Sequence, residues 1–187
     1  MTVKLPVFLD RDGVINANRD DYVKTPFEWV PVPGAISSMA ALHRAGHQII
    51  VVTNQSGIGR GYYSEEAVRG IHKVMLSALG AAGVFPVPVM YCPHQPEDKC
   101  SCRKPETGMI DRARIDYDLP RGGWMVGDAH SDMELGRRSG LTTILVLSGR
   151  GVAQLEIIKT GKLTMPDYIT DSLVTAADII ISSAVTP

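Results

Sequence analysis

An apolar run ends abruptly at two carboxylates in the stretch VFLDRDGV, residues 7–14. Side chains two positions apart leave an extended strand on the same side, so Asp10 and Asp12 are expected to converge at its end. Gly13 then lets the chain turn sharply away. Two carboxylates held this close repel unless one is protonated or a cation lies between them. The stretch therefore predicts a buried strand that leads to a site for a hard cation such as Mg²⁺.

Three further polar clusters decide against a simpler interpretation, in which the acidic end of the strand merely reaches solvent. They occupy residues 53–56, 103–105 and 127–132, and two of the three directly end apolar runs with strand character. Open parallel sheets place their sites at the carboxyl ends of the strands. The clusters are therefore expected to meet the two aspartates at one edge of a sheet.

Length and composition bound the class of protein. The 187 residues fit one domain, expected to span residues 1–187, and the formal net charge of −1 gives no reason to expect a nucleic acid or an anionic membrane as partner. No apolar run approaches the ~20 residues of a membrane span, and the N-terminus lacks the apolar core of a signal peptide. We therefore expect a cytoplasmic protein that works as a monomer.

The rest of the chain alternates between strand-like and helix-like segments. Apolar and β-branched runs predict strands at residues 48–52, 87–91, 124–126, 142–147 and near 168–169. Helices are predicted after Gly34, Ser64, Thr107 and Ser131 and at 173–181. The helix after Ser64 is expected to bury the apolar stripe Val68, Ile71, Met75, Leu76 and Leu79. The helix after Thr107 carries Met109, Ile110, Ala113 and Ile115. The alternation predicts an α/β fold with a central, mostly parallel sheet.

One short segment holds all three cysteines. Cys92, Cys100 and Cys102 lie within eleven residues together with His94. Three thiolates and an imidazole are a tetrahedral set that zinc prefers, and four protein ligands leave no position for water, as in a structural site. A Cys100–Cys102 disulfide, strained at this spacing, or free thiols are the alternatives. Bound zinc would act as a staple that fixes where the two cations at 103–104 point.

Two loops carry candidate contacts for a phosphorylated ligand. Residues 53–61 are rich in hydroxyl, amide and glycine residues and include Arg60, so they can offer N–H groups and a guanidinium to phosphate oxygens. The loop after the first strand contains Asn18, Asp21 and Tyr22 and is expected to lean over the site, although polar surface loops often bind nothing. The chain has no room for a large cap between these segments, so the site should be fairly open.

These clusters resemble, in order, the four motifs of the haloacid dehalogenase (HAD) superfamily, most of whose members are phosphatases. The resemblance runs from about residue 7 to about residue 147 and rests on Asp10-Arg11-Asp12-Gly13-Val14, Thr53, Lys104 and Gly127-Asp128 with Asp132. It implies a three-layer, Rossmann-like HAD fold, here with a minimal cap and a zinc-stapled loop.

The resemblance also implies roles for the polar residues in a phosphatase that works through an aspartyl-phosphate. Asp10 would attack phosphorus, while Asp12 would protonate the leaving oxygen and later activate water. Lys104 would pair with the phosphoryl oxygens and with Asp10, and the Thr53 hydroxyl would donate to a phosphoryl oxygen. The expected ligands of Mg²⁺ are Asp10, the backbone carbonyl of Asp12, and Asp128, with Asp132 behind them.

Within the superfamily, the chain resembles a small zinc-carrying branch that contains the D-glycero-D-manno-heptose-1,7-bisphosphate 7-phosphatases and the histidinol-phosphate phosphatases. Residues 54–61 are similar to the heptose-bisphosphate pattern, because Arg60 is available to a second phosphate and would repel the amine of histidinol phosphate. The implied substrate is a sugar bisphosphate used to make nucleotide-activated heptose for lipopolysaccharide or other surface glycans. Its expected contacts are Asn18, Asp21, Tyr22, Asn54, Gln55, Ser56, Arg60 and Arg103.

One departure from the family is Ala129, where many relatives carry a basic residue directly after the metal-binding aspartate. The help of that residue in metal or phosphate binding is then lost or supplied elsewhere. Two alternatives to a heptose-bisphosphate phosphatase remain. The first is a histidinol-phosphate phosphatase. The second belongs to another class of protein, a catalytically silent zinc module that binds a phosphorylated partner. The acid at Asp12 counts against it, since a binding module gains nothing from that group.

Overall fold

The computed structural model of the protein describes residues 4–161 and 163–183. Its strands are β1 (Val7–Leu9), β2 (Ile49–Asn54), β3 (Val89–Cys92), β4 (Trp124–Gly127), β5 (Thr142–Val146) and β6 (Tyr168–Thr170). They form one sheet in the order β3-β2-β1-β4-β5-β6, and every strand pairing among the described residues is parallel. The predicted mostly parallel sheet is confirmed.

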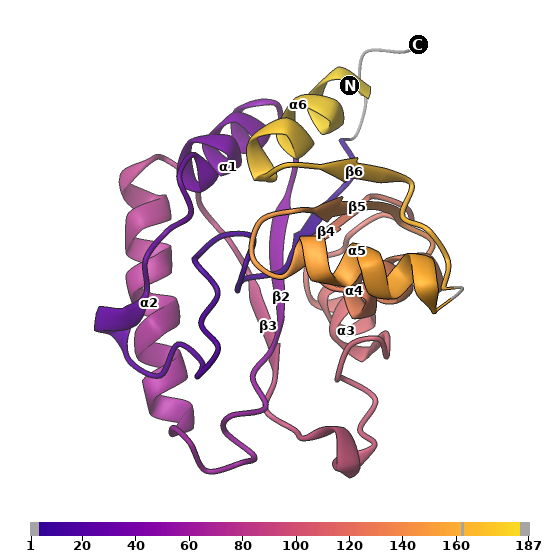
Figure 1. Ribbon diagram of the computed structural model, residues 1–187. Helices are drawn as coiled ribbons and strands as arrows, with labels where there is room; N and C mark the ends of the chain where they lie inside the picture. The colour runs from indigo at the N-terminus through magenta and orange to yellow at the C-terminus, as the bar shows by residue number, and fades with distance from the viewer. Residues whose placement is uncertain (1–3, 162, 184–187) are drawn as a thin grey trace.

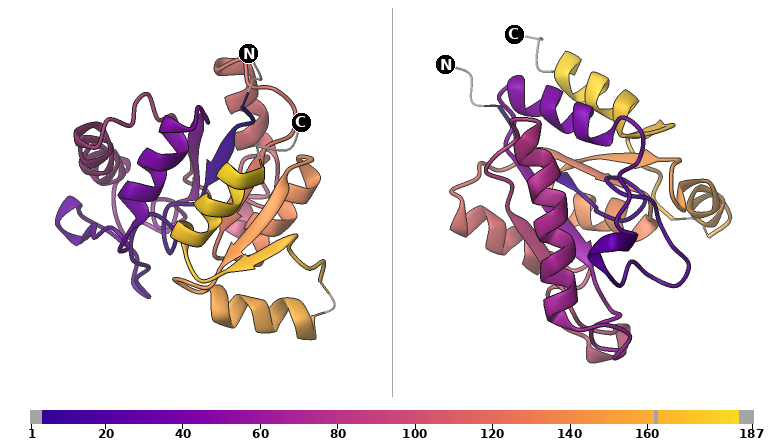
Figure 2. Two further views of the ribbon diagram at one scale, coloured as in Figure 1. Left: turned by 90° about the horizontal axis from the view of Figure 1, so that it is seen from above. Right: turned by 90° about the vertical axis from the view of Figure 1, so that its left-hand side faces the viewer.

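Helices cover both faces of the sheet (Figures 1 and 2). One face packs against α1 (Ala35–Arg44), α2 (Glu65–Ala81) and α6 (Leu173–Ser183), and the other against α3 (Gly108–Asp116), α4 (His130–Arg138) and α5 (Gly151–Thr160). None of the helices in the described part of the chain is both long and apolar enough to cross a membrane. The three layers confirm the predicted α/β architecture.

The alternation of side chains along β1 decides where its terminal acid points. Val7 and Leu9 belong to the apolar cluster under α1, α2 and α6, whereas Phe8 belongs to the cluster under α3 and α4. Successive side chains of a strand leave on opposite faces. Asp10 therefore turns to the α3 and α4 side of the sheet, where Lys104 and Asp132 lie against it.

The strand order creates a crevice at the end of β1. From β1 the chain moves in one direction to β2 and β3, and then returns to build β4, β5 and β6 on the other side. The connections from β1 and β4 consequently lead away from each other, and ligands bind at such switch points outside the carboxyl ends of the strands. Asp10 follows β1 and Asp128 follows β4, so both acids lie at this crevice.

One residue expected in the buried stripe of α2 is exposed. Leu76 is 37% exposed. At 100° per residue, it lies at the margin of the face formed by Val68, Met75 and their neighbours. The position that completes the buried face of α2 is instead His72, which is 7% exposed.

Candidate active site

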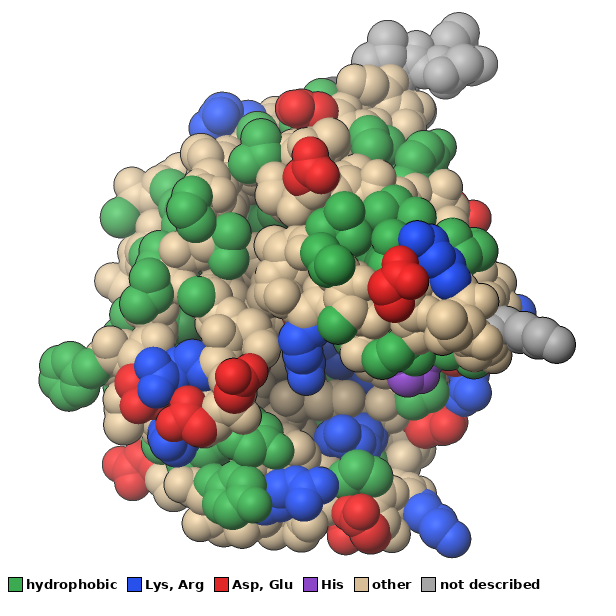
Figure 3. Space-filling model, in the orientation of Figure 1, with side chains coloured by type: hydrophobic (Ala, Val, Ile, Leu, Met, Phe, Trp, Pro, Cys, Tyr) green, Lys and Arg blue, Asp and Glu red, His purple; other side chains and the backbone are tan. Residues whose placement is uncertain are grey.

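A cavity of about 600 Å³ opens at the carboxyl ends of β1, β2 and β4. Figure 3 shows this hollow with lysine and arginine side chains around it. The structure brings together on its lining almost all the residues that were expected to act on a substrate: Asp10, Asp12, Asn18, Tyr22, Thr53, Asn54, Gln55, Ser56, Arg60, Arg103 and Lys104. Segments up to 94 positions apart in the chain thus meet at one edge of the sheet, as predicted.

Asp10 and Lys104 form a buried ion pair on the floor of the cavity. Lys104 Nζ lies 2.9 Å from Asp10 Oδ1 and 2.7 Å from Asp132 Oδ1, and it donates to the Val52 carbonyl at 3.1 Å. Burial lowers the pKa of Lys104, but the two carboxylates outweigh it and leave the pKa above its usual range. Lys104 is therefore a permanent cation beside Asp10.

Three buried acids converge next to this pair. Carboxylate oxygens of Asp10, Asp128 and Asp132 lie within 4.8 Å of one another. Burial is the main cause that raises the pKa of Asp10 to about 7 and that of Asp128 to about 6, and repulsion from Asp132 adds to both. Asp128 Oδ1 is buried without a hydrogen-bond partner among the described residues. Clustered carboxylates with a free oxygen are the donor set of a hard divalent cation, so Mg²⁺ fits here.

Two glycines hold the other oxygen of Asp128. Gly13 (φ +88°) and Gly149 (φ +60°) approach Asp128 Oδ2 so closely that a Cβ atom on either would overlap it. The backbone N–H of Arg150 donates to the same oxygen at 2.8 Å, and the Arg150 Nε lies 3.7 Å away. The loop after β5 thus aims Asp128 and brings a basic side chain to it, although Ala129 itself supplies none.

Asp12 points away from the acid cluster and has a cation of its own. The neighbouring Arg11 donates to both Asp12 oxygens, at 3.0 Å and 2.9 Å, and Asn16 and Gln55 donate to them at 2.9 Å and 3.0 Å. Burial raises the pKa of Asp12, but Arg11 and these hydrogen bonds outweigh it and hold the pKa below its ordinary value. Apart from the expected metal ion, the two aspartates thus have separate cationic partners, Lys104 for Asp10 and Arg11 for Asp12.

The loop after β2 ties the remaining parts together. Thr53 is 1% exposed, and its Oγ1 accepts a hydrogen bond from Gln55 Nε2 at 2.9 Å, so its own proton is free to donate into the cavity. Asn54 exchanges two hydrogen bonds with the backbone of Lys104. The Gln55 amide also contacts Asp12, Arg11 and Tyr63. These amides hold Asp12 and Lys104 in place as well as line the cavity.

The rim of the cavity is basic. Arg60 is exposed, and Arg103 donates to the His94 carbonyl at 3.2 Å, which fixes part of its side chain. Asn18 and Tyr22 lie on the lining, whereas Asp21 lies outside it and pairs with Arg19 at 3.2 Å and Lys24 at 2.7 Å. Its neighbour Asp20 occupies the lining instead.

The four residues of the cysteine segment meet behind Arg103. The Cys102 Sγ lies 3.3 Å from Cys92 Sγ and 3.4 Å from Cys100 Sγ, and His94 Nδ1 lies 3.3 Å from Cys102 Sγ. All three thiols are free, which excludes the disulfide considered as an alternative. Four soft donor atoms within 4.8 Å of one another form a set that could hold zinc.

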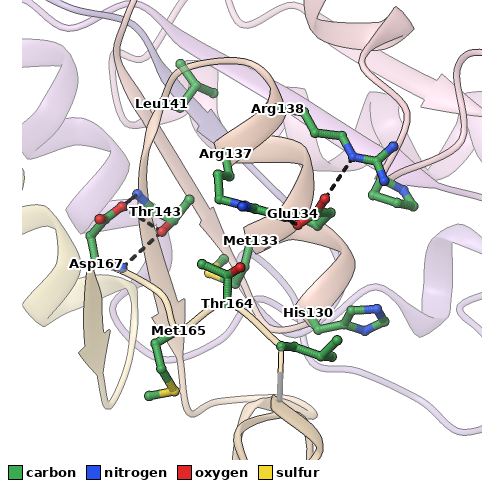
Figure 4. Close-up of a pocket in the computed structure, with 12 residues that line it drawn as sticks. His130, Met133, Glu134, Arg137, Arg138, Leu141, Thr143, Thr164, Met165 and Asp167 are labelled. Atoms are coloured by element: carbon green, nitrogen blue, oxygen red, sulfur yellow. Dashed lines mark hydrogen bonds and ion pairs between the residues drawn. The ribbon is translucent and has the colours of Figure 1, made fainter. Parts of the chain in front are cut away.

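A second cavity of about 560 Å³ lies between α4 and residues 163–167 (Figure 4). It shares only His130 and Pro105 with the first cavity. Its central acid, Glu134, accepts hydrogen bonds from Arg137 at 2.7 Å and from Arg138 at 2.9 Å, so both of its carboxylate oxygens are paired. Asp10, Asp12, Thr53 and Lys104 all line the first cavity.

Comparison with known proteins identifies the family. The family described as HAD-hydrolase-like matches residues 101–176. The D-glycero-beta-D-manno-heptose-1,7-bisphosphate 7-phosphatase of Pseudomonas aeruginosa is 42% identical over 150 residues, which cover 80% of this chain and 84% of that protein. The chain belongs to the HAD-like phosphatases.

Other HAD-like phosphatases extend the match over nearly the whole chain. The D-glycero-beta-D-manno-heptose-1,7-bisphosphate 7-phosphatase of Bordetella bronchiseptica is 34% identical over 179 residues, which cover 95% of this chain and 98% of that protein. The crystal structure of D,D-heptose 1,7-bisphosphate phosphatase from B. bronchiseptica, complexed with magnesium and phosphate, has a TM-score of 0.88 at 34% identity and covers 96% of this chain and 99% of its own. This HAD-like chain is accordingly a phosphoric monoester hydrolase, and the resemblance to the HAD superfamily is confirmed.

Sequence reasoning missed several residues that this HAD-like site uses. Arg11 lies between the two aspartates, but nothing in its position indicates that it turns back onto Asp12. His72 could have been found from its spacing, four after Val68 and three before Met75, which places it on the buried stripe of α2. Arg150 and Tyr63 lie in loops without periodicity, and only the folded chain brings them to the cavity.

Proposed function

We propose that this protein hydrolyses the 7-phosphate of D-glycero-β-D-manno-heptose 1,7-bisphosphate. The observation that carries the proposal is the Asp10 carboxylate, ion-paired with Lys104 and flanked by Asp128 and Asp132 on the floor of a basic cavity. The names of the relatives from P. aeruginosa and B. bronchiseptica support the substrate and its β anomer. The product would enter the biosynthesis of nucleotide-activated heptose for lipopolysaccharide or other surface glycans.

Mg²⁺ would be held by Asp10, the backbone carbonyl of Asp12, and Asp128, with Asp132 beside them. The ion would supply positive charge that allows an anionic nucleophile to approach an anionic phosphoryl group. The free Asp128 Oδ1 and the raised pKa values of Asp10 and Asp128 support this assignment, since a divalent cation relieves the repulsion among these acids.

The chain's own residues perform the chemistry in two steps. An Asp10 oxygen bonds to phosphorus as the bond from phosphorus to the C7 oxygen breaks, and Asp12 gives that oxygen its proton. Asp12 then takes a proton from water, whose oxygen attacks phosphorus and releases phosphate and free Asp10. Lys104 and the Thr53 hydroxyl donate to the equatorial oxygens, where charge accumulates in both transition states.

The far end of the substrate would meet the basic rim. Arg60 and Arg103 can bind the 1-phosphate through charge-assisted hydrogen bonds, which a guanidinium makes in pairs. Asn18 and Tyr22 would contact the sugar, with Asn54, Gln55 and Ser56 below them. Asp21, the remaining expected contact, would act through Arg19, with which it pairs.

We also assign a structural zinc ion to Cys92, His94, Cys100 and Cys102. The loop between β3 and α3 has few buried residues of its own, so four metal bonds would contribute most of its stability. The zinc would then fix the segment that presents Arg103 and Lys104. We expect residues 1–187 to act as a single domain, as a monomer and in the cytoplasm.

Phosphate release tests the substrate. With Mg²⁺ present, kcat/KM should be highest for the β anomer of heptose 1,7-bisphosphate, lower for the α anomer and lowest for histidinol phosphate. A preference for histidinol phosphate would overturn the assignment of Arg60 while leaving the acid–base chemistry in place. Absence of turnover with all three compounds would instead favour a zinc module that binds a phosphorylated partner.

A further inference from the structure

The guanidinium of Arg11 is held on both sides. Arg11 is 1% exposed, and among the described residues it is the largest side chain that is fully buried. On one side its Nε and Nη2 donate to Asp12, and Nη2 also donates to Gln55 Oε1 at 3.2 Å. On the other side its Nη1 lies 3.2 Å from His72 Nε2. A guanidinium carries donors only, so the His72 Nε2 must accept this hydrogen bond.

His72 is built to accept. An acceptor Nε2 requires the neutral imidazole with its proton on Nδ1. Burial, and then the adjacent Arg11, lower the pKa of His72 to about 3, so the ring stays neutral at physiological pH. The ring also packs edge-on against Tyr91, with centroids 5.6 Å apart, and is anchored in the middle of α2. Its lone pair therefore points at Arg11 from a rigid element.

We propose that His72 is a positioning residue for catalysis, which acts through Arg11 to hold the Asp12 carboxylate where it meets the leaving oxygen. This inference rests on the proposed function, because it takes Asp12 as the general acid. Without His72, the Nη1 group of Arg11 loses its acceptor. A buried donor without an acceptor costs free energy, so the guanidinium is expected to rotate toward another acceptor. The Nε and Nη2 groups that bind Asp12 would rotate with the guanidinium and displace the Asp12 carboxylate. A displacement of about 1 Å at a catalytic group can lower the rate up to about 10²-fold.

A merely structural histidine predicts a different pattern. Loss of stability or of general packing lowers activity on every substrate alike. The parameter kcat/KM covers phosphoryl transfer to Asp10 but not the later attack of water, in which Asp12 acts as base. A displaced general acid therefore lowers kcat/KM only where the leaving group needs a proton, as a sugar alkoxide does. The leaving group of p-nitrophenyl phosphate departs readily without protonation. Its kcat/KM therefore depends on the nucleophile, the metal ion and the hydrogen-bond donors, and only weakly on the general acid.

The test compares kcat/KM for β-heptose 1,7-bisphosphate and for p-nitrophenyl phosphate in the same variants. His72→Leu should lose at least about 10-fold on the heptose and less than about 3-fold on the aryl phosphate. His72→Gln, whose amide oxygen can accept from Arg11, should recover most of that loss. His47→Leu removes a buried histidine whose Nδ1 lies 2.8 Å from the Leu5 carbonyl, and it should leave the ratio of the two substrates unchanged.

Two further variants separate the possible failures. Arg11→Lys keeps the charge but not the fork, so it should change the ratio as His72→Leu does, and it serves as the second test if His72→Leu does not fold. Equal losses on both substrates in His72→Leu or Arg11→Lys would overturn the inference. Asp12→Asn should change the ratio more than any of these, and equal losses in that variant would overturn the acid–base assignment itself.

Discussion

Asn54 and Lys104 exchange two hydrogen bonds across the site, although they lie 50 positions apart in the chain: Asn54 Nδ2 donates to the Lys104 carbonyl at 3.3 Å, and the Lys104 N–H donates to Asn54 Oδ1 at 3.1 Å. This pair joins the loop after β2 to the segment that brings the Lys104 ammonium to Asp10. Asn54 therefore fixes the backbone of Lys104, whatever contact it makes with substrate.

Substitution of Asn54 by Ala should reduce kcat about 10-fold or more, because Lys104 would lose its backbone anchor beside Asp10. Asn54→Asp keeps the acceptor for the Lys104 N–H but not the donor, so its kcat should lie between those of the Ala variant and the unaltered protein. Steady-state kinetics with saturating Mg²⁺ checks this order. A wild-type kcat in Asn54→Ala would show that the anchor is dispensable.

Asp128→Asn should stabilise the metal-free protein and at the same time abolish Mg²⁺ binding. In EDTA at pH 8 the variant should be more stable by on the order of 1–2 kcal/mol, because it removes one of three repelling buried charges. Addition of Mg²⁺ should raise the Tm of the unaltered protein but not that of the variant.

Asp116→Asn is the matched control for this experiment, since Asp116 is exposed on α3 and pairs with Arg112. It should keep the full Mg²⁺ response. A Tm increase with Mg²⁺ in Asp128→Asn equal to that of the control would contradict the assignment of Asp128 as a ligand.

His72 should make the protein less stable in mild acid. Its pKa falls from an ordinary 6.5 to about 3 on folding, so between these values the unfolded chain binds a proton that the folded chain does not. The corresponding loss of stability at pH 4 is on the order of 3 kcal/mol. The raised pKa values of Asp10 and Asp128 act in the opposite direction over the same range.

Comparison with His72→Gln isolates the histidine, because both proteins share these aspartates. Urea unfolding from pH 7 to pH 4 should show the free energy of unfolding of the variant rising relative to that of the unaltered protein. A difference independent of pH would mean that His72 titrates alike in the folded and unfolded chain.

Removal of a zinc ligand should loosen the segment that carries Lys104. Metal analysis of the purified protein should give one zinc ion per chain, and Cys102→Ser should lose it. The variant should unfold at lower temperature and lose activity, because Arg103 and Lys104 directly follow this residue. Full activity in a zinc-free Cys102→Ser protein would contradict a role for the metal in placing them.

Arg60→Ala should act on binding of the second phosphate alone. KM for heptose 1,7-bisphosphate should rise on the order of 10-fold, as expected for loss of one charge-assisted pair, while kcat stays close to its original value. The same substitution should leave KM for heptose 7-phosphate, which has no 1-phosphate, unchanged. Equal effects on both compounds would place Arg60 outside the site of the second phosphate.

Local patterns in the sequence were sufficient for the strands, the parallel sheet and the residues that meet at its edge. A buried strand needs a continuous apolar run, so β1 and β2 were visible as such, and each ended at a polar cluster. The exposed Leu76 was wrongly predicted to be buried, because an apolar residue at the margin of a helical stripe satisfies the pattern without being buried.

What the sequence by itself determined about this protein is the α/β order of its elements, the acids and cations that end its strands, and the four candidate zinc ligands, all of which depend on neighbours in the chain. Only the tertiary structure decided that Arg11 turns onto Asp12 with His72 behind it, that Lys104 also pairs with Asp132, and that Gly149 and Arg150 hold Asp128. These contacts join segments far apart in the chain or depend on how a side chain turns, so no local pattern encodes them. The protonation state of each ionisable side chain in the site depends on its burial and on the charges beside it. Both arise only once the sheet and its two helical layers have assembled.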